Sequence, residues 1–165
     1  MDVQAIMSRK LVTVSQDDSV LKVRELFLAW RFHHLLVTER RRLVGVVSDR
    51  DLLKNLSPFI GRDMMERSQD VALLDRKVHQ IMTRKPVTAS LDMSIEEAAQ
   101  RLVNWQVSCL PVVDDQNTAL GIVTWKDLFR AMVPGLTLPS IQGDQPMPED
   151  HHDGLSDGVA FQGMA

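Results

Sequence analysis

An internal repeat constrains this chain more than any other feature of its sequence. Residues 3–56 align with residues 78–132 at an offset of 75, which becomes 76 after one inserted residue in the turn at 114–118. Seventeen of the 54 positions in the first copy are identical in the second. A repeat of this kind has to be recognised before elements are assigned, because overlooking it misassigns the whole fold. The chain therefore contains two copies of one folding unit.

Each copy predicts the order strand, helix, strand, strand, helix. Apolar residues recur at helical spacing from Val20 to Trp30 and again from Ile95, where Ser94 followed by Glu97 predicts a capping box. Runs rich in Val, Ile and Leu predict buried strands. These extended pieces are 11–14, 35–38 and 43–47 in the first copy, and 87–89, 110–113 and 120–123 in the second. Closing helices are expected to begin near Ser48 and Thr124.

We therefore expect an α+β fold of two pseudo-symmetric repeats packed sheet to sheet. A three-stranded sheet with both helices on one face leaves apolar surface that a second copy can bury around a pseudo-two-fold axis. The expected divisions of the chain are repeat 1 at 1–56, a linker with a helix at 57–77, repeat 2 at 78–133, and an acidic, Pro- and Gly-rich flexible tail at 134–165.

The charge distribution limits the kinds of partner. The whole chain has a formal charge of −3, but residues 134–165 hold five acidic residues and no Lys or Arg, which leaves 19 basic and 17 acidic groups elsewhere, or +2. That balance lacks the broad positive field expected of a duplex-binding protein. Charges interrupt every apolar run, and no leader pattern opens the sequence, so we expect a cytoplasmic protein without a membrane span.

No catalytic set emerges from the motifs. The sequence lacks a Walker-type phosphate loop, a Gly-rich dinucleotide turn, His-Glu-x-x-His and Gly-x-Ser-x-Gly. The adjacent His33 and His34 lack a third metal ligand at a recognisable spacing. Cys109 is the single cysteine and opens an apolar strand, which predicts a buried, inert thiol. We expect a protein that is not an enzyme, with no metal site and no required cofactor.

One motif recurs at the end of both apolar hairpins. Gly45-Val-Val-Ser48-Asp-Arg50-Asp51 corresponds to Gly121-Ile-Val-Thr124-Trp-Lys126-Asp127. Helix capping explains the hydroxyl and the carboxylate. It does not explain a cation in the first helical turn, which faces the positive end of the helix dipole at a cost of about 0.3–1 kcal/mol. A bound phosphate would offset that cost, and the carboxylate would accept from two ribose hydroxyls. The doubled motif favours a ribonucleotide over capping alone.

These residues resemble tandem CBS (cystathionine beta-synthase) domains. The resemblance is carried by the duplicated unit, its opening Ile-Met-Ser/Thr-Arg-Lys, the strand Cys109–Asp114 and the two Gly-x-x-Ser/Thr-x-x-Asp ends, and it covers residues 3–132. It implies an adenosine-containing ligand, such as AMP, ADP, ATP or S-adenosylmethionine, in two clefts between the repeats, and a homodimer. One cleft would use Ser48, Arg50 and Asp51 with Val87, Val107 and Ser108; the other would use Thr124, Lys126 and Asp127 with Val12, Phe32 and His33.

The first copy departs from this pattern. It carries Leu36 where the second copy has Pro111, and His33-His34 where the second has Ser108-Cys109. The resemblance implies a regulatory module that binds adenine nucleotides and signals to a partner protein. Two alternatives remain: a ligand-free dimerisation or scaffold protein, and a nucleic-acid binder that uses Arg40–Arg42 with Arg84 and Lys85.

Overall fold

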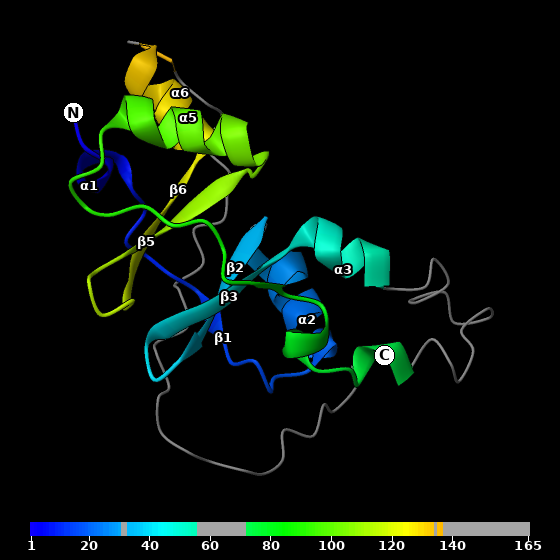
Figure 1. Ribbon diagram of the computed structural model, residues 1–165. Helices are drawn as coiled ribbons and strands as arrows, with labels where there is room; N and C mark the ends of the chain where they lie inside the picture. Colours follow the sequence, from blue (N-terminus) through cyan, green and yellow to red (C-terminus); the bar gives the residue numbers. More distant parts are fainter. Residues whose placement is uncertain (31–32, 56–71, 134, 137–165) are drawn as a thin grey trace.

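The structure is a computed structural model that describes residues 1–30, 33–55, 72–133 and 135–136. Its helices and strands form two halves that lie against each other (Figure 1). One half holds α2 and α3, and the other holds α5 and α6, as a mixed α/β fold of two repeats requires. The expected fold class is confirmed.

The first half is a four-stranded sheet in the order β1-β2-β3-β4 with two helices. β1 pairs parallel to β2, whereas β2–β3 and β3–β4 are antiparallel. The elements are β1 (Thr13–Val14), α2 (Val20–Trp30), β2 (His34–Glu39), β3 (Arg42–Ser48), α3 (Asp49–Asn55) and β4 (Thr83–Arg84).

The second half repeats the arrangement around an antiparallel hairpin. Ser94 caps α5, because its side chain accepts a hydrogen bond from the Glu97 N–H at 3.1 Å. The Glu97 carboxylate pairs with Arg101 at 3.0 Å, so only this half of the expected capping box forms. Ala89 forms a parallel bridge with Val112 in place of a full strand. The elements are α5 (Ile95–Trp105), β5 (Cys109–Val113), β6 (Ala119–Thr124) and α6 (Trp125–Met132). The second copy opens with η1 (Val78–Gln80), a 3₁₀ turn that packs on the first half.

The opening segment of each copy crosses to the other half. The N-terminal helix α1 (Val3–Ile6) lies with α5 and α6 (Figure 1), and Ser8 bridges to Ile122 in β6. In the same way β4, from the second copy, adds a strand to β3. The expectation of one three-stranded sheet per copy is therefore wrong: β4 comes from the other copy, and periodicity within a copy cannot indicate such an exchange.

Three apolar clusters account for the described core apart from Leu74. The clusters of the two halves each include a crossing segment, with Val3 and Met7 in the second half and Val78 and Met82 in the first. The third cluster joins the halves through one face of each hairpin; its buried members are Leu36, Leu43, Val46 and Cys109. This third cluster is the sheet-to-sheet contact that the repeat predicted.

The linker was predicted as a loop followed by a helix. Residues 72–74 are helical, and residues 57–71 lie outside the described part of the chain. The predicted tail at 134–165 also lies outside it, apart from residues 135 and 136. Within the described residues, no helix is long and apolar enough to cross a bilayer.

Candidate functional site

The first strand-to-helix junction places Asp51 over the end of β3. One carboxylate oxygen, Asp51 Oδ2, accepts hydrogen bonds from the Ser48 N–H at 2.9 Å and from the Ser48 hydroxyl at 2.6 Å. The Asp51 N–H donates in return to Ser48 Oγ at 3.1 Å. The reciprocal bonds form a capping box at the start of α3.

The second junction has the same geometry. Asp127 Oδ2 accepts from the Thr124 N–H at 2.8 Å and from the Thr124 hydroxyl at 2.6 Å. Asp127 Oδ1 lies 3.7 Å from Arg130 Nη1. Capping, the simpler explanation of the motif, is thus present at both junctions. All the capping bonds to each carboxylate use Oδ2.

A hydrogen bond between the halves brings the first junction to Ser108. His34 is opposite Ser48 in the β2–β3 ladder, and its Nε2 lies 2.7 Å from Ser108 Oγ. Ser108 directly precedes β5, whose first residue is opposite Thr124. The structure therefore places Ser48 and Ser108, which were predicted to share a cleft, at the same boundary between the two halves, which we call the seam.

The neighbouring His33 belongs to the first junction. Its Nδ1 lies 2.9 Å from Asp49 Oδ2, and its carbonyl accepts from the Asp49 N–H at 3.1 Å. His33 was predicted to line the cleft of Thr124 and Asp127, but its described contacts are with the start of α3. Asp49 was missed by the sequence analysis, although its position directly after Ser48 could have marked it as a partner for the histidine pair.

The electrostatics of this seam favour a neutral His34. Burial lowers the pKa of the His34 imidazole below its ordinary value of 6.5, with His33 and Arg50 acting in the same direction and Asp49 and Asp51 against it. Burial opposes the charged form of Asp49, but hydrogen bonds from His33 and from the Arg50 backbone N–H outweigh it. The pKa of the Asp49 carboxyl is therefore below its ordinary value.

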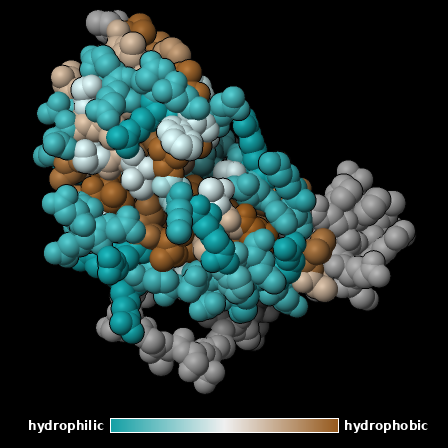
Figure 2. Space-filling view, viewed as in Figure 1, coloured by the Kyte–Doolittle hydropathy of each residue, from teal (hydrophilic) through white to brown (hydrophobic). Residues whose placement is uncertain are grey.

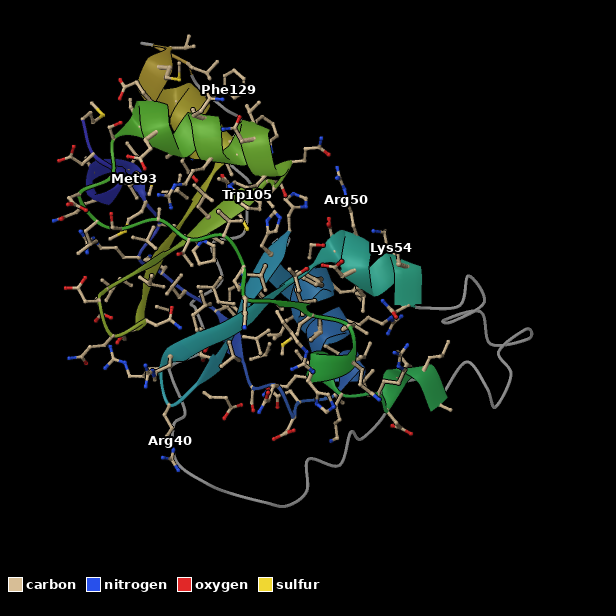
Figure 3. All side chains as sticks on the ribbon, in the orientation of Figure 1. Arg40, Arg50, Lys54, Met93, Trp105 and Phe129 are labelled. Carbon is tan, nitrogen blue, oxygen red and sulfur yellow. The ribbon has the colours of Figure 1, made fainter. Side chains whose placement is uncertain are left out.

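The valines predicted to line the two clefts are partly buried. Val12 packs on the first-half core, and Val87 and Val107 pack on the second-half core. Phe32 lies outside the described residues. Arg50 is exposed at the start of α3 (Figure 3).

The second junction carries Trp125 at the position of Asp49, and Trp125 forms an aromatic pair with Phe129. Lys126 Nζ lies 5.8 Å from the centre of the Trp125 ring, and Trp125 packs edge-on against Phe129 with ring centres 5.7 Å apart. Trp125 therefore packs against the next turn of its own helix.

The glycine of each motif has a packing role. A Cβ on Gly45 would lie 2.7 Å from Met82 Sδ and 2.9 Å from the Thr83 carbonyl oxygen. On Gly121 it would lie 2.5 Å from Met7 Sδ and 3.0 Å from the carbonyl oxygen of Ser8. The glycines are thus needed where the crossing segment of the other copy passes the strand.

A hollow of about 530 Å³ lies at the opposite end of β3 from Ser48. Its walls come from the segment after β1, the start of β3, β4 with its flanking residues, and the β5–β6 turn: Gln16, Leu43, Val44, Met82, Arg84, Lys85, Pro86, Thr88 and Asn117. It does not include the junction residues. In the described part of the chain, no group of three or more His, Cys, Asp or Glu side chains is arranged to hold a metal ion.

Two repeated strand-to-helix junctions across one seam define a tandem-repeat module, and the CBS domain family profile matches it twice, at residues 3–58 and 78–134. The chain belongs to the CBS domain family. A CBS domain-containing protein of Dictyostelium discoideum is 32% identical over 133 residues, which cover 79% of this chain and 90% of that protein. An uncharacterized protein of Methanocaldococcus jannaschii is 31% identical over 150 residues, covering 76% of this chain and 88% of that protein.

Solved structures of CBS domain pairs are also similar. CBSX2, solved in complex with AMP, has a TM-score of 0.66 at 28% identity and matches 79% of this chain and 95% of its own. The CBS domain pair of protein MJ0100, solved with 5′-methylthioadenosine and S-adenosyl-L-methionine, has a TM-score of 0.66 at 25% identity and matches 80% and 95%.

Some relatives are enzymes that are much longer than the matching region. The homoserine O-acetyltransferase of Methanococcus vannielii is 24% identical over 131 residues, which are 79% of this chain and 24% of the enzyme. The matched part of the present chain consists of the two CBS repeats.

Proposed function

We propose that this chain is a regulatory module, without catalytic activity of its own, that binds adenosine-containing ligands at the seam between its CBS repeats. The observation that carries the proposal is the His34–Ser108 hydrogen bond at 2.7 Å, because it brings one junction and the opposite repeat together. The AMP complex of CBSX2 and the S-adenosylmethionine complex of the MJ0100 pair support the ligand class.

Asp51 and Asp127 would hold the ribose. The cap uses Oδ2 of each carboxylate, so Oδ1 can accept from two adjacent hydroxyls without loss of the cap. Ser48 and Thr124 would face the phosphates, but the proton of each hydroxyl is donated to its aspartate, so a phosphate would draw that proton away from the cap. Arg50, Lys126 and the imidazoles of His33 and His34 supply positive charge or N–H donors nearby.

A second copy of the chain is the proposed partner for the helical face of the second half. Six large apolar side chains on α5, on α6 and at the residue after α6 are exposed to solvent: Val103, Trp105, Trp125, Phe129, Met132 and Val133. A cluster of exposed aromatic and aliphatic groups is typical of a protein interface. A ligand at the seam could signal through such an interface or to a regulated protein in the cytoplasm. Either signal requires the ligand to have different affinities for two arrangements of the repeats.

Isothermal titration with AMP, ATP and S-adenosylmethionine tests the ligand proposal. We expect Asp51→Asn and Asp127→Asn each to weaken binding by about 1–3 kcal/mol, the usual value of a charge-assisted hydrogen bond, and each to affect one of two sites. The amide keeps one oxygen for the cap, so the melting temperature should change little.

Asp115→Asn is the matched control, because Asp115 is an exposed turn residue at the other end of the β5–β6 hairpin. Unchanged affinity in both junction variants, with lowered melting temperatures, would show that the two carboxylates act only as caps. Absence of binding below millimolar concentration for all three compounds would favour the scaffold function.

A further inference from the structure

The tips of the two hairpins meet and form one end of the molecule. The Leu43 N–H donates to the Asn117 carbonyl at 2.9 Å, and the Ala119 N–H donates to the Arg41 carbonyl at 3.1 Å. The Asn117 side chain adds a bond to the Leu43 carbonyl at 2.7 Å. Two turns that are far apart in sequence are thereby joined. Figure 3 shows Arg40 on this end, far from Arg50 at the start of α3.

Positive charge gathers on this hairpin end. Arg40–Arg42 form the first turn, and the two crossing segments add cations beside the hairpins. Arg84 pairs with Gly45 in β3, and Arg9 follows the Ser8 bridge to β6. The exposed cations, which we call the basic tip, are Arg9, Lys10, Arg40, Arg41, Arg42, Arg84 and Lys85. The visible face is strongly hydrophilic at its lower edge, where this end lies (Figure 2).

Three carboxylates lie in or beside the hairpin turns; two of them accept hydrogen bonds, whereas the exposed Asp115 forms none among the described residues. Glu39 Oε1 accepts from the Ser15 hydroxyl at 2.9 Å. Asp114 Oδ1 accepts from the N–H groups of Gln116 and Thr118 at 2.9 and 2.8 Å. Within the described residues, no cation of the basic tip forms an ion pair. The tip therefore carries seven exposed cations against three carboxylates, of which Asp114 interacts electrostatically with Arg41.

The sequence itself contains a matching polyanion. Asp144, Glu149, Asp150, Asp153 and Asp157 follow the last described residue, and no Lys or Arg occurs among them. An extended chain covers up to about 3.3–3.6 Å per residue, so the 21 residues from Leu136 to Asp157 reach up to about 70 Å. A folded unit of 100 residues has a radius of gyration of only about 13 Å, so this segment can reach any part of the surface.

We propose that the basic tip binds the chain's own acidic segment, residues 144–157. A tethered segment is present at an effective concentration near millimolar, whereas a free polyanion has to be supplied at that level to compete. The charges of the segment and the tip are opposite, and their attraction is screened by salt. The docked segment would shield the tip from nucleic acid and from a second copy. This contact does not require a ligand at the seam.

Carbodiimide cross-linking of the full chain tests the contact, because the reagent joins an amine to a carboxylate in direct contact. At low salt, peptide mass spectrometry should find Lys10 or Lys85 linked to carboxylates of the acidic segment within one molecule. The yield should fall at least fivefold in 1 M salt, where the Debye length is about 3 Å. Links found only between isotopically distinct copies would overturn the proposal.

A double variant removes charge from the tip without disturbing its turn. Arg40 and Arg41 have φ values of 49° and 67°, so Arg40→Asn with Arg41→Gly suits the backbone. We expect this variant to reduce the cross-link yield at least threefold. The control Lys22→Gln with Lys54→Gln removes two exposed cations from α2 and α3 and should leave the yield unchanged. Equal yields in the tip variant and the native chain would count against the contact.

A labelled oligouridylate measures access to the tip. Neutralising the segment (Asp144→Asn, Glu149→Gln, Asp150→Asn, Asp153→Asn and Asp157→Asn) should tighten oligouridylate binding about tenfold at low salt, because the native segment competes for the same surface. Equal affinities for the native chain and this variant would show that the segment does not occupy the tip, which would then be free for an external polyanion.

Discussion

The two strand-to-helix junctions have the same backbone geometry and different chemistry around it. Each carboxylate caps its helix through Oδ2, with a bond of 2.6 Å from the hydroxyl. At the first junction, however, His34 reaches across the seam, whereas its counterpart at the second is Cys109, buried in the cluster between the halves. The cap is therefore a property of the repeated unit, and the seam residues distinguish one junction from the other.

The largest predicted effect tests whether the halves fold together. Leu35 and Leu110 are equivalent and fully buried. Leu35→Ala and Leu110→Ala should each lower the free energy of unfolding by about 2–5 kcal/mol. Urea denaturation followed by circular dichroism should show one transition for each variant, because the third apolar cluster and the crossing segments couple the halves. Two separate transitions would contradict this coupling.

The next effect tests the packing of the crossing segments at each junction. Gly45→Ala and Gly121→Ala should each cost about 1–3 kcal/mol of unfolding free energy, because the new methyl group meets a methionine sulfur and a backbone carbonyl. Thermal denaturation measures the loss. A variant as stable as the native chain would show that the crossing segment can move away from its strand.

A smaller effect concerns the polar contact across the seam. His34→Gln and Ser108→Ala should each lower the free energy of unfolding by about 0.5–1.5 kcal/mol, and a double-mutant cycle should show that the two losses are not additive.

The same histidine predicts a pH dependence. Because the pKa of folded His34 is lowered, the unfolded chain takes up a proton first as pH falls from 6.5. Native stability should therefore decline as pH falls below 6.5, and the decline should be shallower in His34→Gln. If the stability of the native chain and of His34→Gln falls in parallel with pH, protonation of His34 does not cause the decline.

The last prediction compares the reactivity of a thiol at the two equivalent seam positions, 34 and 109. Burial raises the pKa of Cys109 to about 12, so its thiolate is scarce at neutral pH. A disulfide reagent should modify native Cys109 at least a hundredfold more slowly than the unfolded chain. In a His34→Cys variant the new thiol should react faster than Cys109, because position 34 is less buried. Similar slow rates at both positions would show that the seam excludes the reagent equally.

The sequence was sufficient for the repeated fold but not for its exchange of segments. Runs of Val, Ile and Leu identified β2, β3, β5 and β6, because buried strands need apolar side chains on both faces. β4 was missed, since its two residues, Thr83 and Arg84, are exposed and carry no apolar pattern. Which half receives a crossing segment depends on three-dimensional packing. An alignment of the two copies contains no information about that packing.

The junctions could be located from the doubled motif, and their capping bonds follow from the spacing of hydroxyl and carboxylate. The pairing of His33 with Asp49 and the reach of His34 to Ser108 could not be predicted. Both depend on side-chain orientation, and the second also depends on how closely the halves approach. Residues that contact each other across a pseudo-symmetry axis leave no periodic signal along the chain.

The crossing of the opening segments has a consequence for a polypeptide that carries one copy alone. Gly45 packs against Met82 and Thr83 of the second copy, and Gly121 packs against Met7 and Ser8 of the first. A single copy would therefore lack the segment that covers its own strand, and two such polypeptides would have to exchange opening segments to complete either half. In the covalent tandem this exchange occurs within one molecule, so it does not depend on protein concentration.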